Sequence, residues 1–219
     1  MEKALDYKKL YLLQDKVLSA VFSLNNGFYL TGGTALHRFY YNARYSDDLD
    51  FFTSNDDLFS EAINEIRESL KEDFSLDHTV ETRDFHRFLA NDLLQLDFVN
   101  DRVYREGKSR IIRGIKVDNE VNILANKITA IISRDEAKDI FDLFYIAVHK
   151  EFSWDDMLLI ANKKSKVDKE TLINRLKTFP LSWLSNIKII EPFSITDDMI
   201  QQISGDILLG QDNSLHINR

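Results

Sequence analysis

The sequence predicts an α+β fold, in which a mixed β-sheet is flanked by helices and followed by a helical C-terminal part. Apolar residues recur at helical spacing in residues 6–24 and again from residue 118 onward. Residues 74–117 instead break into short runs that suit strands. Only two prolines and seven glycines interrupt the 219 residues, which favours long helices. We therefore expect an α/β part over residues 1–117 and a helical part over residues 118–219, with a common core and a common functional site.

The N-terminal half is expected to alternate helices with short strands. A first helix over residues 6–24 has one apolar face, and Asn25-Asn26-Gly27 ends it. The next elements are a strand, a helix, a second strand and a helix opened by Asp56-Asp57, with expected ranges 28–30, 35–41, 49–52 and 56–70. Four further strands are expected at 74–80, 85–89, 93–99 and 111–117, with turns at Asn91-Asp92 and Gly107.

The C-terminal half is expected to be helical throughout. Asn119 is a suitable N-cap for a helix that extends to about Ser133. A second helix is expected over residues 135–150. Residues 151–219 should form further helices, with no repeat and no low-complexity tract.

Composition excludes several classes of protein. Without cysteine, the chain has no disulfide, no thiolate zinc site and no cysteine nucleophile. The N-terminus lacks the apolar stretch of a signal peptide, and no run of about 18 apolar residues predicts a membrane span. A cytoplasmic protein without membrane contact is therefore expected. The formal charge of −8 argues against broad electrostatic binding of nucleic acid, so any such contact should be confined to one face.

The segment over residues 30–52, LTGGTALHRFYYNARYSDDLDFF, carries the chemistry. A strand ends at Gly32-Gly33 and a helix follows at once. Glycines let the backbone approach a ligand, and the free N–H groups at the start of a helix attract phosphate. Further on, Asp48 and Asp50 flank a leucine at the start of a strand. Side chains two apart on a strand point the same way, so the two carboxylates should project together while the leucine faces the core.

Two carboxylates that converge on one point repel each other unless a positive charge lies between them. Mg²⁺, or Mn²⁺ in its place, is the natural partner, because it prefers oxygen ligands and is usually held by one or two carboxylates together with substrate phosphates. A Gly-Gly pair alone is usually just a turn, and an Asp-x-Asp alone is usually surface charge or a helix cap. Their joint occurrence beside two predicted strands indicates a site for a nucleoside triphosphate (NTP) and its metal.

The same residues resemble the first motif of the AbiEii/AbiGii toxin family of nucleotidyltransferases, which belongs to the DNA polymerase β-like superfamily. That motif is a Gly-Gly or Gly-Ser pair, a short helix, an Arg followed by Ser or Thr, and then Asp-x-Asp-Phe. Its counterparts in this chain are Gly32, Gly33, Arg44, Ser46, Asp48, Asp50 and Phe51. Two later segments also resemble helices of the family, residues 126–130 (NKITA) and residues 134–143 (RDEAKDIFDL). The resemblance covers about residues 28–146 and implies the polymerase β-like nucleotidyltransferase fold.

The expected nucleotide-binding residues combine the glycine turn with polar side chains: Gly32, Gly33, Thr34, Arg44, Ser46, Lys127 and Asp139. The resemblance implies that Lys127 reaches the triphosphate, and that Asp142, with Asp139 one helical turn before it, is an acidic partner on the next helix. From the residues alone, other interpretations stay open. Lys127 has apolar neighbours and needs a partner, a phosphate or a path to solvent. The two aspartates share a helix face and can form surface ion pairs with Arg134 and Lys138.

A third metal-binding carboxylate is expected in this superfamily, on a later strand. Asp97 is the candidate, because it interrupts an apolar strand, where a charged residue needs a partner or a metal. Asp92 and Glu81 are weaker competitors. The five histidines show no spacing typical of a zinc site. His37, in the helix after the glycines, suits either nucleotide contact or ordinary packing.

These observations predict an enzyme that transfers a nucleoside monophosphate from an NTP to an acceptor hydroxyl. Asp48, Asp50 and Asp97 would hold the metal, and Lys127 and Asp142 would assist. The resemblance implies the toxin of a bacterial toxin–antitoxin or abortive-infection pair, whose partner is an antitoxin, often a winged-helix transcriptional regulator. It also makes the 3′ end of tRNA an expected acceptor.

Two other functions stay open at this point. A protein hydroxyl is the alternative acceptor, mildly favoured by the acidic net charge. A catalytically idle fold that only binds a partner is the other, although the intact aspartate pair argues against it. A group of four lysines is either a surface for the acceptor or an ordinary solvated face: Lys163, Lys164, Lys166 and Lys169.

Overall fold

The computed structural model describes residues 5–24, 26–54 and 58–216. The chain divides into two compact units. Unit 1 comprises Met1–Arg102 and Lys108–Asp118, and unit 2 comprises Val103–Gly107 and Asn119–Arg219. The sheet belongs to unit 1, whereas the long helices that follow Asp118 belong to unit 2.

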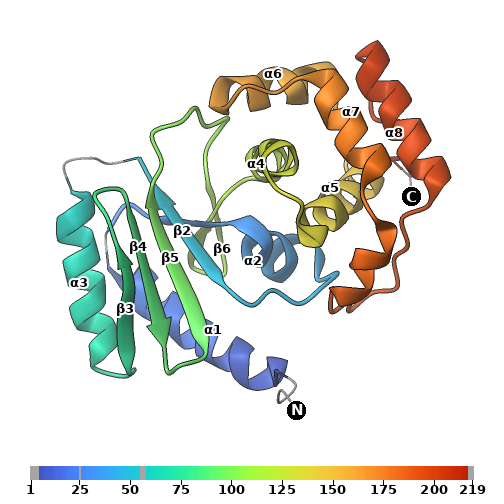
Figure 1. Ribbon diagram of the computed structural model, residues 1–219. Coiled ribbons are helices and arrows are strands. Elements are labelled where there is room, and N and C mark those ends of the chain that lie inside the picture. The colour runs from blue at the N-terminus through green and yellow to red at the C-terminus, as the bar shows by residue number, and fades with distance from the viewer. Residues whose placement is uncertain (1–4, 25, 55–57, 217–219) are drawn as a thin grey trace. The chain divides into compact units, whose positions relative to one another are not determined.

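Unit 1 is built on a mixed seven-stranded sheet with strand order β3-β4-β5-β2-β1-β7-β6 (Figure 1). The strands are β1 (Tyr29–Thr31), β2 (Leu49–Thr53), β3 (Leu76–Glu81), β4 (Phe85–Ala90), β5 (Leu94–Asn100), β6 (Arg110–Ile112) and β7 (Ile115–Val117). Strand β2 runs parallel to β5, and β1 runs parallel to β7, while the other neighbours are antiparallel. This arrangement makes β1, β2 and β5 adjacent, which places the glycine turn and the predicted aspartates on neighbouring strands.

The helices of unit 1 are α1 (Tyr7–Ser23), α2 (Gly32–Leu36), a π-helical turn η1 (His37–Tyr41) and α3 (Phe59–Lys71). Asp6 caps α1 by accepting hydrogen bonds from the first backbone N–H groups, and the buried face of α1 repeats every three or four residues, as predicted. Phenylalanines fill the core, with Phe51 of β2 stacked on Phe98 of β5 at a centroid distance of 4.7 Å. The predicted α+β fold, with a mixed sheet flanked by helices, is confirmed.

Two details of unit 1 differ from the sequence prediction. The single strand expected at 111–117 is a hairpin, because Arg113 and Gly114 both have positive φ and turn the chain back on itself. The helix after the glycines begins at Gly32 rather than near residue 35. The predicted helix start at Asp56-Asp57 lies outside the described residues, as does Asn25.

Unit 2 contains the helices α4 (Glu120–Ser133), α5 (Ala137–His149), α6 (Trp154–Lys164), α7 (Lys169–Thr178), the 3₁₀ turn η2 (Leu181–Asn186) and α8 (Asp197–Leu209). The predicted cap is confirmed, since the Asn119 side chain accepts a hydrogen bond from the backbone N–H of Asn122 at 2.8 Å. The predicted helical C-terminal part is likewise confirmed. Within the described ranges, no helix combines the length and the apolar character needed to cross a membrane.

Candidate active site

The turn from β1 into α2 lies directly against one of the predicted metal ligands. Thr31 pairs with Asp50 across β1 and β2, so the next residue, Gly32, lies beside the Asp50 side chain. Gly32 has φ +70°, a conformation that favours glycine. A Cβ added to Gly32 would collide with the Asp50 carboxylate, whose Cγ would be 3.1 Å away. Both the backbone conformation and the close approach therefore require glycine at this position.

The second glycine contacts two other residues of the motif. A Cβ on Gly33 would lie 2.6 Å from Arg44 Nη2 and 2.9 Å from Ser46 Oγ. Arg44 and Ser46 are both buried, and Arg44 Nη1 donates a hydrogen bond to the carbonyl of Tyr45 at 2.9 Å. The structure thus gathers Gly33, Arg44 and Ser46 in one place.

Asp48 is held through its backbone. The hydroxyl of Thr34, which is fully buried, donates to the Asp48 carbonyl at 2.5 Å. Leu49 is fully buried, while Asp48 and Asp50 are half-buried, which is the alternation that the sequence predicted. Because the Thr34 hydroxyl is engaged inside the protein, its observed contact is structural, and contact of Thr34 with phosphate stays a prediction.

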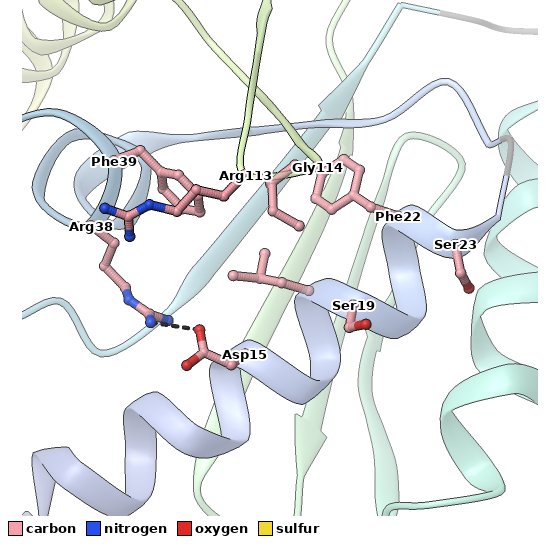
Figure 2. Close-up of a pocket in the computed structure, with 10 residues that line it drawn as sticks. Asp15, Ser19, Phe22, Ser23, Arg38, Phe39, Arg113 and Gly114 are labelled. Atoms are coloured by element: carbon pink, nitrogen blue, oxygen red, sulfur yellow. Dashed lines mark hydrogen bonds and ion pairs between the residues drawn. The ribbon is translucent and has the colours of Figure 1, made fainter.

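Helix α1 supports the loop that precedes Asp48. Gln14 is fully buried, and its Nε2 donates to the Ser46 carbonyl at 2.9 Å. Arg38 Nη1 donates in turn to Gln14 Oε1 at 3.1 Å. Figure 2 shows Arg38 at the edge of a cavity of about 420 Å³, where its guanidinium pairs with Asp15 at 2.6 Å. An ordered chain of polar contacts therefore leads from this cavity to the aspartate loop.

Replacing Gln14 by leucine is expected to lower the free energy of unfolding by about 1–3 kcal/mol. The leucine leaves the buried Ser46 carbonyl without this donor, and an unsatisfied buried group costs about that much. Urea denaturation measures the loss, with Gln201→Leu on the exposed face of α8 as the matched control, expected within about 0.5 kcal/mol of wild type. Equal stability of the two variants would show that the Gln14 contact does not support the loop.

Asp97 lies next to Asp50 in the sheet, since the two residues are paired in the parallel register of β2 and β5. Asp97 is buried, and both of its oxygens accept from Arg87 of β4, from Nε at 2.7 Å and from Nη2 at 2.7 Å. Hydrogen bonding to Asp97 raises the pKa of Arg87, and the charges of Asp48 and Asp50 raise it further. The guanidinium of Arg87 therefore interacts favourably with the carboxylates of Asp48, Asp50 and Asp97.

The two competitors for the third carboxylate lie elsewhere. Asp92 is exposed in the β4–β5 turn at φ +54°. Glu81 pairs across β3 and β4 with His86, one position along β4 from Arg87 and hence on the opposite face of the sheet. The strand register thus brings Asp97 rather than Asp92 or Glu81 beside Asp50. His37 is buried at the start of η1, which agrees with the packing interpretation.

Unit 2 contains a cluster of buried charges. Lys127 Nζ lies 2.7 Å from Asp139 Oδ1 and 2.7 Å from Asp142 Oδ2, and both carboxylates are fully buried. Arg134 Nε donates to Asp139 Oδ2 at 2.8 Å. Burial alone would raise the pKa of Asp139, but Lys127 and Arg134 outweigh it and lower that pKa. The two aspartates share a helix face, as predicted, but that face is buried and not solvated.

Two of the four lysines at residues 163–169 have ordinary surface contacts. Lys163 lies over the ring of Tyr104, with its Nζ 4.5 Å from the ring centroid. Lys169 pairs with Asp155 at 2.7 Å, and both side chains are well exposed. These contacts agree with the interpretation of this group as a solvated face.

A family model and several relatives match this chain. The model described as nucleotidyl transferase AbiEii toxin, type IV toxin–antitoxin system, matches residues 16–181, which is most of the sequence. The chain belongs to this family. The family resemblance and the class of enzyme predicted from the sequence are thereby confirmed.

One relative of this AbiEii-family nucleotidyltransferase is similar in sequence, and two solved structures are similar in fold. An uncharacterized protein of Aquifex aeolicus is 27% identical over 202 residues, which cover 85% of this chain and 91% of the relative. The crystal structure of JHP933 from Helicobacter pylori matches with a TM-score of 0.53 and 20% identity, over 82% of this chain and 77% of that one. MenT4, a nucleotidyltransferase toxin of Mycobacterium tuberculosis, matches with a TM-score of 0.51 and 17% identity, over 77% of this chain and 62% of that one.

Sequence reasoning missed one residue of the candidate site. Arg87 forms the ion pair with Asp97, yet nothing in the local sequence distinguishes it from a solvated arginine on a strand. The signal lies in the register, which pairs Arg87 with Asp97 across β4 and β5. An arginine and an aspartate at matched positions of two adjacent predicted strands form a detectable pattern only once the hairpin register is known.

Proposed function

We propose that this chain transfers a nucleoside monophosphate from an NTP to an acceptor hydroxyl, in a reaction that depends on a divalent metal held by Asp48 and Asp50. The observation that carries the proposal is the contact between the Asp50 carboxylate and Gly32, with Asp97 beside Asp50 in the sheet. Membership in the AbiEii family supports the reaction class. In this transfer a bond forms between the acceptor oxygen and the α-phosphorus, the bond from the α-phosphorus to the bridging oxygen breaks, and pyrophosphate and a proton are released.

The donor set fits magnesium or manganese. Asp48, Asp50 and Asp97 offer carboxylate oxygens alone, which is the ligand type that these hard cations prefer. Asp48 and Asp50 are half-buried and not sealed in the core, so ligands can reach them. When bound, the ion would activate the attacking hydroxyl and neutralise charge on the leaving pyrophosphate. Arg87 already supplies one positive charge to Asp97, so it and the cation would share that carboxylate.

The other residues of unit 1 would position the reactants. The backbone at Gly32 and Gly33 would face the phosphates, because glycine allows that close approach. Arg44, buried against Gly33, would fix the loop and add positive charge near the nucleotide. Such catalysis depends mainly on positioning and electrostatics. The roles implied for Lys127, Asp139 and Asp142 toward the triphosphate stay predictions.

A substitution in the glycine turn tests whether the position of Asp50 matters. Gly32→Ala and Gly114→Ala both place alanine at positive φ, a backbone conformation that costs about 1–2 kcal/mol of stability at either position. At Gly114 an added Cβ has no neighbour within 4 Å, whereas at Gly32 it displaces the Asp50 carboxylate. We therefore expect only Gly32→Ala to lose transfer, by roughly 10²-fold, because small displacements of catalytic groups have effects of that size. Full activity of a folded Gly32→Ala protein would show that transfer does not depend on the position of the Asp50 carboxylate.

For the acceptor we propose the 3′ end of tRNA. The description of the family as a toxin, and the similarity to a nucleotidyltransferase toxin of M. tuberculosis, support a target needed for growth. The purified protein would be incubated with Mg²⁺ and each α-³²P-labelled NTP, together with either total tRNA or cell-extract protein. Label in tRNA supports the proposal, and label in protein supports the alternative acceptor that the net charge of −8 mildly favours. Absence of label together with absence of Mg²⁺-dependent NTP binding would indicate an idle fold.

We further propose a separately encoded antitoxin as partner, of the winged-helix regulator type. The family description as a type IV toxin–antitoxin system supports an antitoxin as partner. Induced expression of the wild-type chain should slow bacterial growth, whereas Asp50→Asn should not. Equal growth inhibition by the two proteins would show that the toxicity does not depend on nucleotidyl transfer.

A further inference from the structure

The β3–β4 hairpin carries a second group of metal-ligating side chains: His78, Glu81 and His86. Each offers one donor atom, and the three donor atoms lie within 4.8 Å of one another. The spacing of the histidines in the sequence did not indicate a zinc site, and the gathering becomes visible only in the structure. The group is separate from the aspartate site, because His86 and Arg87 are successive residues of β4 and point to opposite faces of the sheet.

A β-bulge makes the three side chains converge. In a regular strand His78 and Glu81, three positions apart, would face opposite sides. The register shifts between His78 and Val80, so that His78 is paired with Phe88 and Glu81 with His86. Phe88 and His86 are two apart on β4 and share a face, and the shift therefore brings Glu81 to the same face as His78. Bulges often re-aim side chains near functional sites.

The close contacts within the group involve both ring nitrogens of His78. His86 Nδ1 lies 3.0 Å from His78 Nε2, and His78 Nδ1 lies 3.4 Å from Glu81 Oε2. Donor atoms around a tetrahedral zinc ion are roughly 3.3 Å apart, given bonds of about 2.0–2.1 Å. The Glu81 side chain is 68% exposed and free to adjust, whereas His86 is packed against Phe59 and fixed. One ring nitrogen from each histidine and one carboxylate oxygen lie within 4.8 Å of one another, so a movement of the exposed Glu81 side chain would let them close on a single ion.

We propose that His78, Glu81 and His86 bind a divalent transition-metal ion of the zinc class, at the face of the β3–β4 hairpin that lies beside α3 (Figure 1). Two imidazoles and one carboxylate suit zinc better than magnesium, which prefers oxygen ligands. The group opens on a cavity of about 400 Å³, which leaves room for a fourth ligand. Arg67 and Arg83 also line this cavity, and their charge favours an anionic fourth ligand.

A simpler account of the same contacts is a hydrogen-bond chain, in which His86 donates to His78 and His78 donates to Glu81. That chain needs no metal and predicts no specific binding of Zn²⁺. The two accounts therefore differ in a quantity that can be measured on the intact protein, namely the affinity for Zn²⁺ alone.

The test uses the full chain carrying Asp48→Asn and Asp50→Asn, so that ions bound at the aspartate site do not contribute. Zn²⁺ affinity is measured by competition with a chromophoric chelator, and the visible spectrum of added Co²⁺ reports tetrahedral coordination. In this background Glu81→Gln and His78→Gln remove single ligands, and Glu72→Gln, an exposed residue just beyond α3, is the matched control. Circular dichroism confirms that each variant is folded.

We expect one Zn²⁺ per chain, with affinity at least about 10-fold weaker in Glu81→Gln and in His78→Gln and unchanged in Glu72→Gln. A tetrahedral Co²⁺ spectrum should appear with the intact ligand set and be lost in the His78 variant. The proposal is overturned if the double aspartate variant binds no Zn²⁺ stoichiometrically. It is equally overturned if both ligand variants bind Zn²⁺ as tightly as the Glu72→Gln control.

Discussion

Asp50→Asn is expected to lower nucleotidyl transfer by at least about 10³-fold while the protein stays folded. The change removes one charge from a half-buried carboxylate next to the glycine turn, and losing one preorganised charge in phosphoryl transfer has an effect of this size. Asparagine keeps the shape of the side chain, so its fit against Gly32 is retained. Incorporation of labelled nucleotide, followed over time with saturating Mg²⁺, measures the loss.

The matched control is Asp92→Asn, which removes the same charge from an exposed turn of the same unit. Asp92 has φ +54°, and asparagine tolerates that conformation well, so stability and activity should both be retained. If Asp50→Asn and Asp92→Asn had the same activity, Asp50 would have no part in the reaction. Rescue of Asp50→Asn by a higher Mn²⁺ concentration would further tie the loss to metal binding.

Lys127→Met is expected to have the largest effect on stability, a loss of about 3–5 kcal/mol at neutral pH. The change leaves Asp139 and Asp142 fully buried without the ammonium group that lies 2.7 Å from each, and removing one partner of a buried ion pair costs that amount. Urea denaturation of the wild type and the variant measures the difference. The control is Lys169→Met, which breaks an exposed pair with Asp155 and should cost less than about 1 kcal/mol.

The effect of Lys127→Met on stability is expected to depend on pH. The folded-state pKa of Asp139 is lowered, so its contribution to stability is present above the unfolded-state pKa of about 4 and is lost as the pH falls through the lower, folded-state value. The wild type should therefore lose stability in acid, and Lys127→Met should lose less, since it no longer has this pair. If the difference in the free energy of unfolding between the two proteins stayed constant from pH 7 to below about 4, the lowered pKa of Asp139 would not contribute to stability.

Local patterns in the sequence were sufficient for several elements of the fold and the site. The alternation of Asp48, Leu49 and Asp50 predicted one buried and two accessible side chains, and that is the observed burial. Asn119 was recognisable as a helix cap because capping depends on residues only three positions apart. In both examples the physical cause acts within a few residues, so the sequence displays it directly.

Features set by pairing between distant segments were not predictable in this way. The ion pair of Arg87 with Asp97 depends on strand register, and the gathering of His78 with Glu81 depends on a bulge. The buried partners of Lys127 lie 12 and 15 positions away on another helix, so the sequence showed only that the lysine needed a partner. The hairpin at Arg113-Gly114 was missed because the short apolar runs on either side look like one continuous strand.

A crystal of the protein grown with Mn²⁺ and a non-hydrolysable NTP analogue would test the metal assignment most directly, through the anomalous scattering of manganese. We expect an anomalous peak with oxygens of Asp48 and Asp50 among its ligands and with the triphosphate beside Gly32 and Gly33. The peak should be absent from crystals of Asp50→Asn grown under the same conditions. Manganese bound with the nucleotide at a place that Asp48 and Asp50 do not reach, or an undiminished peak in the variant, would contradict the proposed mechanism.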